Sequence, residues 1–141
     1  MINWQELPIQ KLIKTPFSCD CGKIHQVSIE DILIENKAIM RLPELMQKYR
    51  CKNVFIIADE NTYQAAGKKV ESVLKKTQFS VNKHIFIRAM PLVPDEKTMG
   101  ELIIHFPEKS DIIIAVGTGT INDVAKYISH RMHIPYIIVG N

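Results

Sequence analysis

Long hydrophobic runs are missing from this 141-residue sequence. No apolar stretch approaches the roughly 18 residues that a membrane-spanning helix needs. The first six residues, MINWQE, also lack the hydrophobic core of a secretory signal. The sequence therefore predicts neither a membrane span nor secretion, and the expected location is the cytoplasm.

Cysteine and clustered positive charge are scarce as well. Three cysteines, an odd number, do not make a disulfide framework, and they fit a reducing compartment. The formal net charge is only +3, and the lysines and arginines are spread among acidic residues. No nucleic-acid partner is expected, because such partners require a clustered basic face.

An alternation of strand and helix patterns is present from about residue 40 onward. Apolar runs of strand length at 54–58 and within 111–116 predict strands buried on both faces, as in parallel sheets. Further strands are predicted at 81–87 and 136–139. Apolar residues at helical spacing predict a short helix after Met40, one over about 62–76, one from Asp95 to before Pro107, and one after residue 120.

On the helix over about 62–76, the spacing places Tyr63, Ala66, Val70, Val73 and Leu74 on the inner side. The helix after Asp95 carries Met99, Leu102, Ile103 and Phe106, and one face of the last helix carries Val124, Tyr127 and Ile128, with Met132 as a possible extension. Alternating strands and helices imply right-handed βαβ units. The predicted fold class is therefore α/β, a Rossmann-like parallel sheet with helices on both faces. It is preceded by a short irregular or β-hairpin segment. The predicted organisation is an N-terminal extension over 1–30 and an α/β domain over 31–141, and residues 24–39, across this boundary, have room for short strands.

The segment Gly117-Thr118-Gly119-Thr120 directly follows the third predicted strand and opens a helix. Glycines let the backbone turn tightly and approach a ligand, and the helix start offers free amides and a positive dipole end. Together they suit a phosphate or pyrophosphate, with Asp123 in the first helical turn. A tight structural turn capped by threonine is the alternative. The segment is neither a Gly-x-Gly-x-x-Gly fingerprint nor a Walker loop.

A second polar segment, with Asp59, Asn61 and Thr62, follows the first buried strand. An acidic residue at this place can hydrogen-bond the ribose hydroxyls of a dinucleotide. The alternative is that Asp59 or Asn61 only caps the next helix, and spacing does not separate the two.

The N-terminal stretch also holds Cys19, Cys21 and His25. A structural zinc site usually takes four ligands with Cys-x-x-Cys spacing, whereas here the cysteines are one residue apart and no fourth ligand is evident. The sequence favours a turn between strands, and no metal ligand is predicted. The isolated residues Cys51, His84, His105, His130 and His133 are interpreted as surface or packing residues.

Residues 111–126 and 134–140 resemble the sn-glycerol-1-phosphate dehydrogenases, members of the iron-containing alcohol dehydrogenase and dehydroquinate synthase superfamily. Its usual loop is Gly-Gly-Gly-Ser/Thr-x-x-Asp-x-Ala-Lys. The matching positions are Gly117, Gly119, Thr120, Asp123, Ala125 and Lys126. Thr118 stands at the middle glycine, a change that the loop tolerates if the φ angle of Thr118 stays negative. The turn at Asp59 also looks like the family's first βα turn.

The resemblance implies an NAD or NADP cofactor and reduction of dihydroxyacetone phosphate to sn-glycerol 1-phosphate by hydride transfer. The expected cofactor contacts are Asp59, Asn61, Thr62, Gly117, Thr118, Gly119, Thr120 and Asp123, while catalytic residues stay unknown. The negative charge of Asp59 favours NAD. In the family a divalent metal (zinc, nickel or iron) is held by one Asp and two His of a helical C-terminal domain. That domain is expected to lie outside this chain, so the 141 residues alone are expected to bind nucleotide weakly and not to turn over substrate.

Other interpretations stay open at this point. Glycerol dehydrogenase and 3-dehydroquinate synthase use the same nucleotide fold. A non-catalytic nucleotide-binding module is a further alternative, and a flavodoxin-like receiver domain with Asp59 as phosphoacceptor ranks lower. A small phosphorylated substrate is the expected second ligand, and a homo-oligomer is compatible with the sequence.

Overall fold

A computed structural model describes residues 7–140 and divides the chain into two units, Met1–Ala38 and Ile39–Asn141. The change of unit comes later in the chain than the predicted boundary after residue 30. Residues 1–6, on which the expected lack of a secretory signal depends, lie outside the described residues. No helix in the described part of the chain is long and apolar enough to cross a bilayer.

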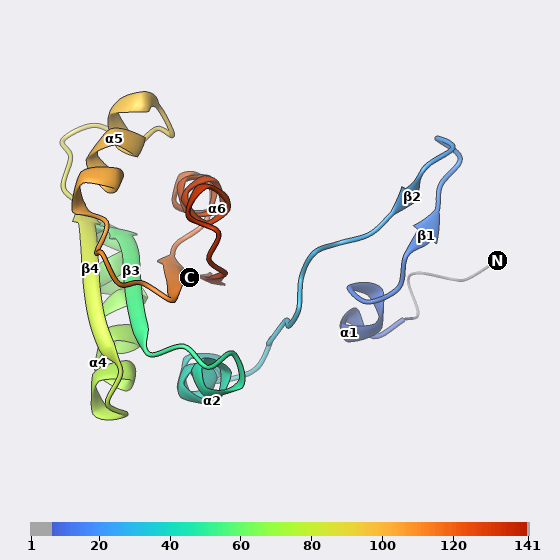
Figure 1. The fold of residues 1–141 in the computed structure, drawn as a ribbon, viewed down its shortest axis with the longest axis horizontal. Helices are drawn as coiled ribbons and strands as arrows, with labels where there is room; N and C mark the ends of the chain where they lie inside the picture. Colours follow the sequence, from blue (N-terminus) through green and yellow to red (C-terminus); the bar gives the residue numbers. More distant parts are fainter. Residues whose placement is uncertain (1–6, 141) are drawn as a thin grey trace. The chain divides into compact units, whose positions relative to one another are not determined.

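The first unit contains a short helix and a β-hairpin. Helix α1 (Ile9–Leu12) precedes strands β1 (Phe17–Ser18) and β2 (Ile24–His25), which pair antiparallel. The predicted hairpin is thus confirmed (Figure 1). Of residues 24–39, where short strands were expected, only Ile24–His25 form one.

A four-stranded parallel sheet with the order β4-β3-β5-β6 forms the centre of the second unit. Its strands are β3 (Asn53–Asp59), β4 (Ser80–Phe86), β5 (Ile112–Val116) and β6 (Tyr136–Val139). The chain leaves β3 for β4 on one side and later returns to place β5 on the other side of β3. The order therefore reverses between β3 and β5, and in open α/β sheets ligands bind outside the carboxyl ends of the strands at such a switch point.

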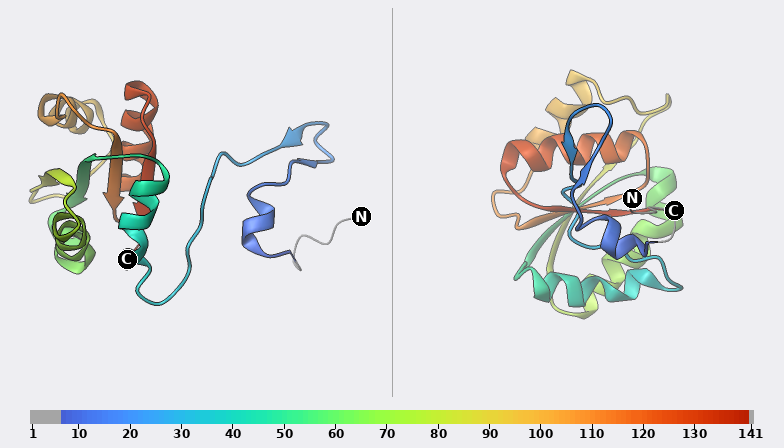
Figure 2. Two further views of the ribbon diagram at one scale, coloured as in Figure 1. Left: turned by 60° about the horizontal axis from the view of Figure 1, so that its bottom comes forward. Right: turned by 90° about the vertical axis from the view of Figure 1, so that its right-hand side faces the viewer.

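Helices cover both faces of this sheet, as predicted (Figure 2, right). The 3₁₀ turn Ala38–Arg41 leads into α2 (Leu42–Lys48), and α3 (Glu60–Thr62), a π-helical turn (Tyr63–Gly67) and α4 (Lys68–Lys76) follow one another. Helices α5 (Glu96–His105) and α6 (Thr120–Met132) complete the set. One core cluster joins α2 and α4 to the sheet, and a second joins α5 and α6 to it.

The side chains of β3 divide between these two core clusters. Val54, Ile56 and Ala58 belong to the cluster with α2 and α4, and Phe55 and Ile57 belong to the cluster with α5 and α6. Successive strand residues point to opposite faces, so a strand covered on both sides must be apolar throughout. This requirement explains the uninterrupted apolar run.

Asp111 fixes the start of β5 against the start of β3. Its Oδ2 atom accepts hydrogen bonds of 2.8 Å from the amides of Lys52 and Asn53, and its own amide donates to the Asn53 carbonyl at 2.8 Å. The two amide hydrogen bonds hold the pKa of the Asp111 carboxyl below its usual value. The register of β3 against β5 is thus set at the amino ends of the strands.

Glu71 ties the helix that begins at Glu60 to the sheet. Burial by itself would raise the pKa of Glu71, but hydrogen bonds from Lys75, Lys83 and the Tyr63 hydroxyl outweigh burial and bring the pKa to about 2. Lys83 lies on β4, and its Nζ atom is 2.7 Å from Glu71 Oε2. A charged carboxylate that is 10% exposed therefore connects α4 to β4.

Three residues in the apolar patterns of the predicted helices are exposed. Ile103 is 51% exposed, Tyr127 is 48% exposed and Met132 is 36% exposed. In α5 the buried residues are Thr98 and Leu102, and the neighbour of Leu102 is turned away by about 100° in an α-helix. An apolar residue next to the buried stripe of a helix thus does not have to join it.

Candidate functional site

The two polar segments singled out in the sequence meet at the carboxyl ends of β3 and β5. Gly117 is buried, has φ = 136° and donates its amide to the Val139 carbonyl at 2.9 Å. A Cβ atom built on Gly117 would lie 3.1 Å from Cγ2 of Thr62 and 3.3 Å from Cβ of Ile121. The approach of the first βα turn to the second therefore depends on glycine at this position.

Gly119 differs from Gly117 in having open space around it. It has φ = 54° and ψ = −118°, and a Cβ atom built there would meet nothing within 4 Å. Both Gly119 and Thr118 are exposed, and Thr118 is not among the residues of positive φ. The Thr118 backbone thus satisfies the condition under which the loop tolerates a side chain in place of the middle glycine.

Helix α6 begins at Thr120 without a side-chain cap. Gly119 is the N-cap residue, and glycine has no side chain that could accept a hydrogen bond from the first amides of the helix. The amide of Asp123 is the first to bond within the helix, to the Gly119 carbonyl at 3.0 Å. A 13-residue helix therefore presents its positive end and its uncapped amides beside an open glycine.

Asp59 and Thr62 form a reciprocal cap at the start of α3. Asp59 Oδ1 accepts from the Thr62 amide at 2.8 Å, and Thr62 Oγ1 accepts from the Asp59 amide at 3.1 Å. Helix capping by Asp59, left open by the sequence, is thus observed. Within residues 7–140, Asp59 Oδ2 makes no hydrogen bond, so one carboxylate oxygen is still available to a ligand.

The remaining predicted cofactor contacts, Asn61, Thr120 and Asp123, lie at the same two βα turns. Asn61 is exposed, and Thr120 is half-buried at the first position of α6. The carboxylate of Asp123 lies 3.6 Å from Lys126 Nζ on the surface of α6. A hollow between α2 and α4, which Pro43 and Val73 help to line, is lined by none of the predicted cofactor contacts.

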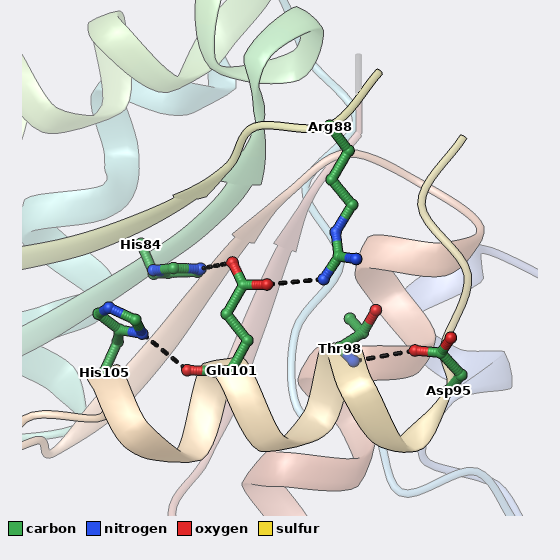
Figure 3. A network of polar contacts seen from close by, with 6 residues as sticks. All are labelled: His84, Arg88, Asp95, Thr98, Glu101 and His105. Carbon is green, nitrogen blue, oxygen red and sulfur yellow. Dashed lines mark hydrogen bonds and ion pairs between the residues drawn. The ribbon is translucent and has the colours of Figure 1, made fainter. Parts of the chain in front are cut away.

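A network at the end of β4 was missed by the sequence analysis (Figure 3). Glu101 on α5 bonds His84 Nε2 at 2.8 Å and Arg88 at 2.6 Å. The ring of His105, one turn further along α5, lies 4.6 Å from the ring of His84 and bonds the Glu101 carbonyl. The sequence shows only that Glu101 and His105 are four residues apart, about one helical turn. Tertiary packing brings His84 and Arg88 next to Glu101.

The architecture and the loop can be compared with known proteins. A family model described as iron-containing alcohol dehydrogenase matches residues 33–141. The chain belongs to this family. The match contains both turns of the candidate site, so the resemblance inferred from the loop residues is confirmed at the level of the family.

Several curated relatives are similar over most of this chain. The glycerol-1-phosphate dehydrogenase of Halalkalibacterium halodurans, whose name specifies NAD(P)+, is 34% identical over 124 residues, which are 86% of this chain and 31% of that protein. The protein of the same name from Bacillus licheniformis is 33% identical over 129 residues, 89% of this chain and 32% of its own length. The chain spans about a third of the length of the curated relatives it matches.

Solved structures show the same architecture. The crystal structure of glycerol dehydrogenase from Schizosaccharomyces pombe superimposes with a TM-score of 0.61 at 26% identity, over 73% of this chain and 25% of that one. A 1,3-propanediol oxidoreductase gives a TM-score of 0.59 at 21% identity, over 74% of this chain and 27% of that one. At this identity the similarity shows a shared fold only.

The close approach at Gly117 leads to a stability prediction. Gly117→Ala should lower the free energy of unfolding by about 1–3 kcal/mol, because the new methyl group meets Thr62 and Ile121 in a backbone conformation that L-residues disfavour. Gly100→Ala is the matched control. Gly100 lies in α5 with nothing within 4 Å of a built Cβ, so alanine should stabilise the protein by about 0.5–1 kcal/mol. Urea unfolding measures both, and equal effects would contradict the role assigned to Gly117.

Proposed function

We propose that this chain is the dinucleotide-binding part of an NAD(P)-dependent dehydrogenase that acts on a small phosphorylated polyol, of the glycerol-1-phosphate dehydrogenase type. The observation that carries the proposal is the meeting of two ligand-type turns at the switch point between β3 and β5. The names of the similar curated relatives support the cofactor and the substrate class.

The pyrophosphate of the cofactor would bind at the start of α6. Its charge complements the helix dipole, and the uncapped amides from Thr120 onward are free to donate to phosphate oxygens. The open space at Gly119 allows a ligand to approach the backbone closely, as a cradle for phosphate requires. Thr118 and Thr120 would add hydroxyl donors beside the same helix start.

The adenosine ribose would bind beside Asp59 and Asn61. One oxygen of Asp59 caps α3 through Thr62, which leaves the other oxygen to accept hydrogen bonds from ribose hydroxyls. The carboxylate also repels a 2′-phosphate, so NAD is favoured over NADP. Arg88, which follows the neighbouring strand β4, is already bonded to Glu101 and is not a free cation for that phosphate.

Reduction of the substrate needs groups that the described residues at the carboxyl edge of the sheet do not supply. When bound, NADH supplies the hydride for reduction of the substrate carbonyl. Within residues 39–140, no three side chains of His, Cys, Asp or Glu lie close enough to share a metal ion. Residues 39–140 therefore offer no ready set of ligands for a divalent metal of the kind implied by the family.

A polyol without phosphate is the second candidate substrate. Glycerol dehydrogenase 1 of Schizosaccharomyces pombe is 31% identical to this chain over 93 residues, and the solved glycerol dehydrogenase from the same yeast shares the fold. The glycerol-1-phosphate dehydrogenases match a larger share of this chain, which favours the phosphorylated substrate.

Nucleotide binding can be tested at Gly119. Titration of the chain with NADH, followed by fluorescence, should show binding that Gly119→Val weakens at least about tenfold, or by about 1.4 kcal/mol, by closing the approach to the backbone. Gly22→Val is the control for backbone strain, because Gly22 also has positive φ and open space but lies in the hairpin. Unchanged affinity in Gly119→Val would leave the loop as a structural turn only.

Cofactor choice can be tested at Asp59. Asp59→Asn keeps a good helix cap and removes the charge, so the preference for NADH over NADPH should fall about three- to tenfold, since only NADPH carries the repelled 2′-phosphate. Asp95→Asn is the matched control variant for Asp59→Asn, because Asp95 caps α5 through the Thr98 amide in the same way. An identical preference ratio in wild type and Asp59→Asn would refute the ribose contact.

Turnover by the chain alone provides a separate test. The 141 residues should not oxidise NADH in the presence of dihydroxyacetone phosphate with added zinc or nickel, because the carboxyl edge holds no metal-type donor cluster within residues 39–140. Turnover that scales with protein concentration and disappears in Gly119→Val would show that the chain carries a complete active site.

A further inference from the structure

The hairpin of the first unit brings together three side chains that bind soft and borderline metal ions. The donor atoms of Cys19, Cys21 and His25 all lie within 4.8 Å of one another. The closest pair is Cys21 Sγ and His25 Nε2, at 3.0 Å. The sequence had favoured a turn between strands at this place; the structure shows that turn and, in addition, a convergence of donors that the Cys-x-Cys spacing did not reveal.

The backbone of the hairpin explains this convergence. Phe17 and Ser18 pair with His25 and Ile24, so Cys19 follows directly at the end of β1. The amide of Cys19 donates to the Lys23 carbonyl at 3.1 Å, and the amide of Gly22 donates to the Cys19 carbonyl at 3.0 Å. Gly22 has φ = 78°, which lets the chain reverse within the loop. The loop thereby returns to His25 on β2 and brings it near both cysteines.

The imidazole is also held in place. The ring of Phe17, the strand partner of His25, stacks on the imidazole with a centroid distance of 5.4 Å and an interplanar angle of 27°. Cys19 and Cys21 are both exposed free thiols, so an ion can reach them from solvent.

The distances suit a tetrahedral ion after small adjustments. With zinc–sulfur bonds of about 2.3 Å and zinc–nitrogen bonds of about 2.0 Å, ligand atoms of a tetrahedral site lie roughly 3.5–3.8 Å apart. The 3.0 Å pair would have to open and the widest pair, at no more than 4.8 Å, would have to close. Each change is on the order of 1 Å, within the reach of side-chain rotation in an exposed loop.

The first unit has little else to hold its fold. Among residues 7–38, Ile13 is the single buried hydrophobic side chain, whereas Ile24 and Ile34 are 75% and 80% exposed. Segments shorter than about 40 residues rarely bury enough apolar surface to be stable by themselves, and metals or disulfides commonly supply the difference. A bound ion would cross-link the two strands at the loop end of the hairpin.

We propose that the β1–β2 hairpin binds one zinc ion through Cys19 Sγ, Cys21 Sγ and His25 Nε2, with the fourth position open to water. Two thiolates and one imidazole form a donor set that zinc prefers, and calcium or magnesium would instead require oxygen ligands. Binding releases the thiol protons to solvent and involves no change of oxidation state.

Cobalt(II) serves as the spectroscopic probe for this site. The full 141-residue chain, reduced and stripped with a chelator, should take up one cobalt ion. It should then show thiolate-to-cobalt charge-transfer bands and the ligand-field bands of a tetrahedral ion, and stoichiometric zinc should abolish both. Absence of charge-transfer bands in protein whose three thiols are verified as reduced would overturn the proposal.

Variants test the assignment of the ligands. Cys19→Ser, Cys21→Ser and His25→Gln should each weaken zinc binding at least tenfold in competition with a chromogenic chelator, and the Cys19→Ser/Cys21→Ser double variant should remove the charge-transfer bands. His25→Cys should keep binding and strengthen those bands, because it adds a third thiolate. Cys51→Ala, which removes the buried thiol of the second unit, and His133→Gln should leave affinity and spectra unchanged.

Folding is checked in the same samples. Since the ligands lie in an exposed hairpin, the thermal transition of the parallel sheet should be the same in wild type and in the double variant without metal. Equal zinc affinity in the wild type and the double variant, or loss of binding in Cys51→Ala with an intact sheet, would refute the site. NADH binding that fails while zinc binding persists would count against the proposed nucleotide site alone.

Discussion

The parallel pairing of β3 with β5 is the constraint on which the candidate site depends. At the amino ends of these strands, Asp111 accepts hydrogen bonds from two successive amides and fixes their register. At the carboxyl ends, the same register brings Gly117 so close to Thr62 that a Cβ atom on Gly117 would lie 3.1 Å from Cγ2 of Thr62. One pairing thus aligns the strands and brings two turns, more than fifty residues apart in sequence, to a single edge.

The residues of this edge combine structural and ligand-binding roles. Asp59 caps α3 with one carboxylate oxygen and leaves the other free, while α6 begins at a glycine and has no side-chain cap at all. One βα turn is therefore completed by its own side chains, and the other is left incomplete. A helix start without a cap costs stability unless water or a ligand accepts its hydrogen bonds, and an anionic ligand does so with the help of the helix dipole.

The two units are stabilised in different ways. The sheet of the second unit has a central strand covered on both faces and a charged carboxylate, Glu71, that connects a helix to an outer strand. The first unit has a single buried hydrophobic side chain among its described residues and instead gathers two thiols and an imidazole at one loop. A segment with so little core needs another source of order, and a coordinated ion is a source that its residues can supply.

The sequence alone determined the fold class, the strands and helices of the second unit, and the family. It did so because buried parallel strands must be apolar throughout, and because the residues around Gly117 form a specific loop. It could not separate a helix cap from a ribose contact at Asp59, since both use the same carboxylate. Helical spacing also did not reveal that Ile103 and Tyr127 are exposed.

Only the tertiary structure decided which distant groups meet. The contact between Gly117 and Thr62 and the bonds of Glu101 to His84 and Arg88 have no signature in local spacing. Cys19, Cys21 and His25 are close in sequence, but only the hairpin shows that their donor atoms converge. Each depends on strand order, strand register or the direction in which a loop returns. Local sequence patterns specify individual helices and strands, whereas contacts between them follow from how the whole chain buries its apolar surface.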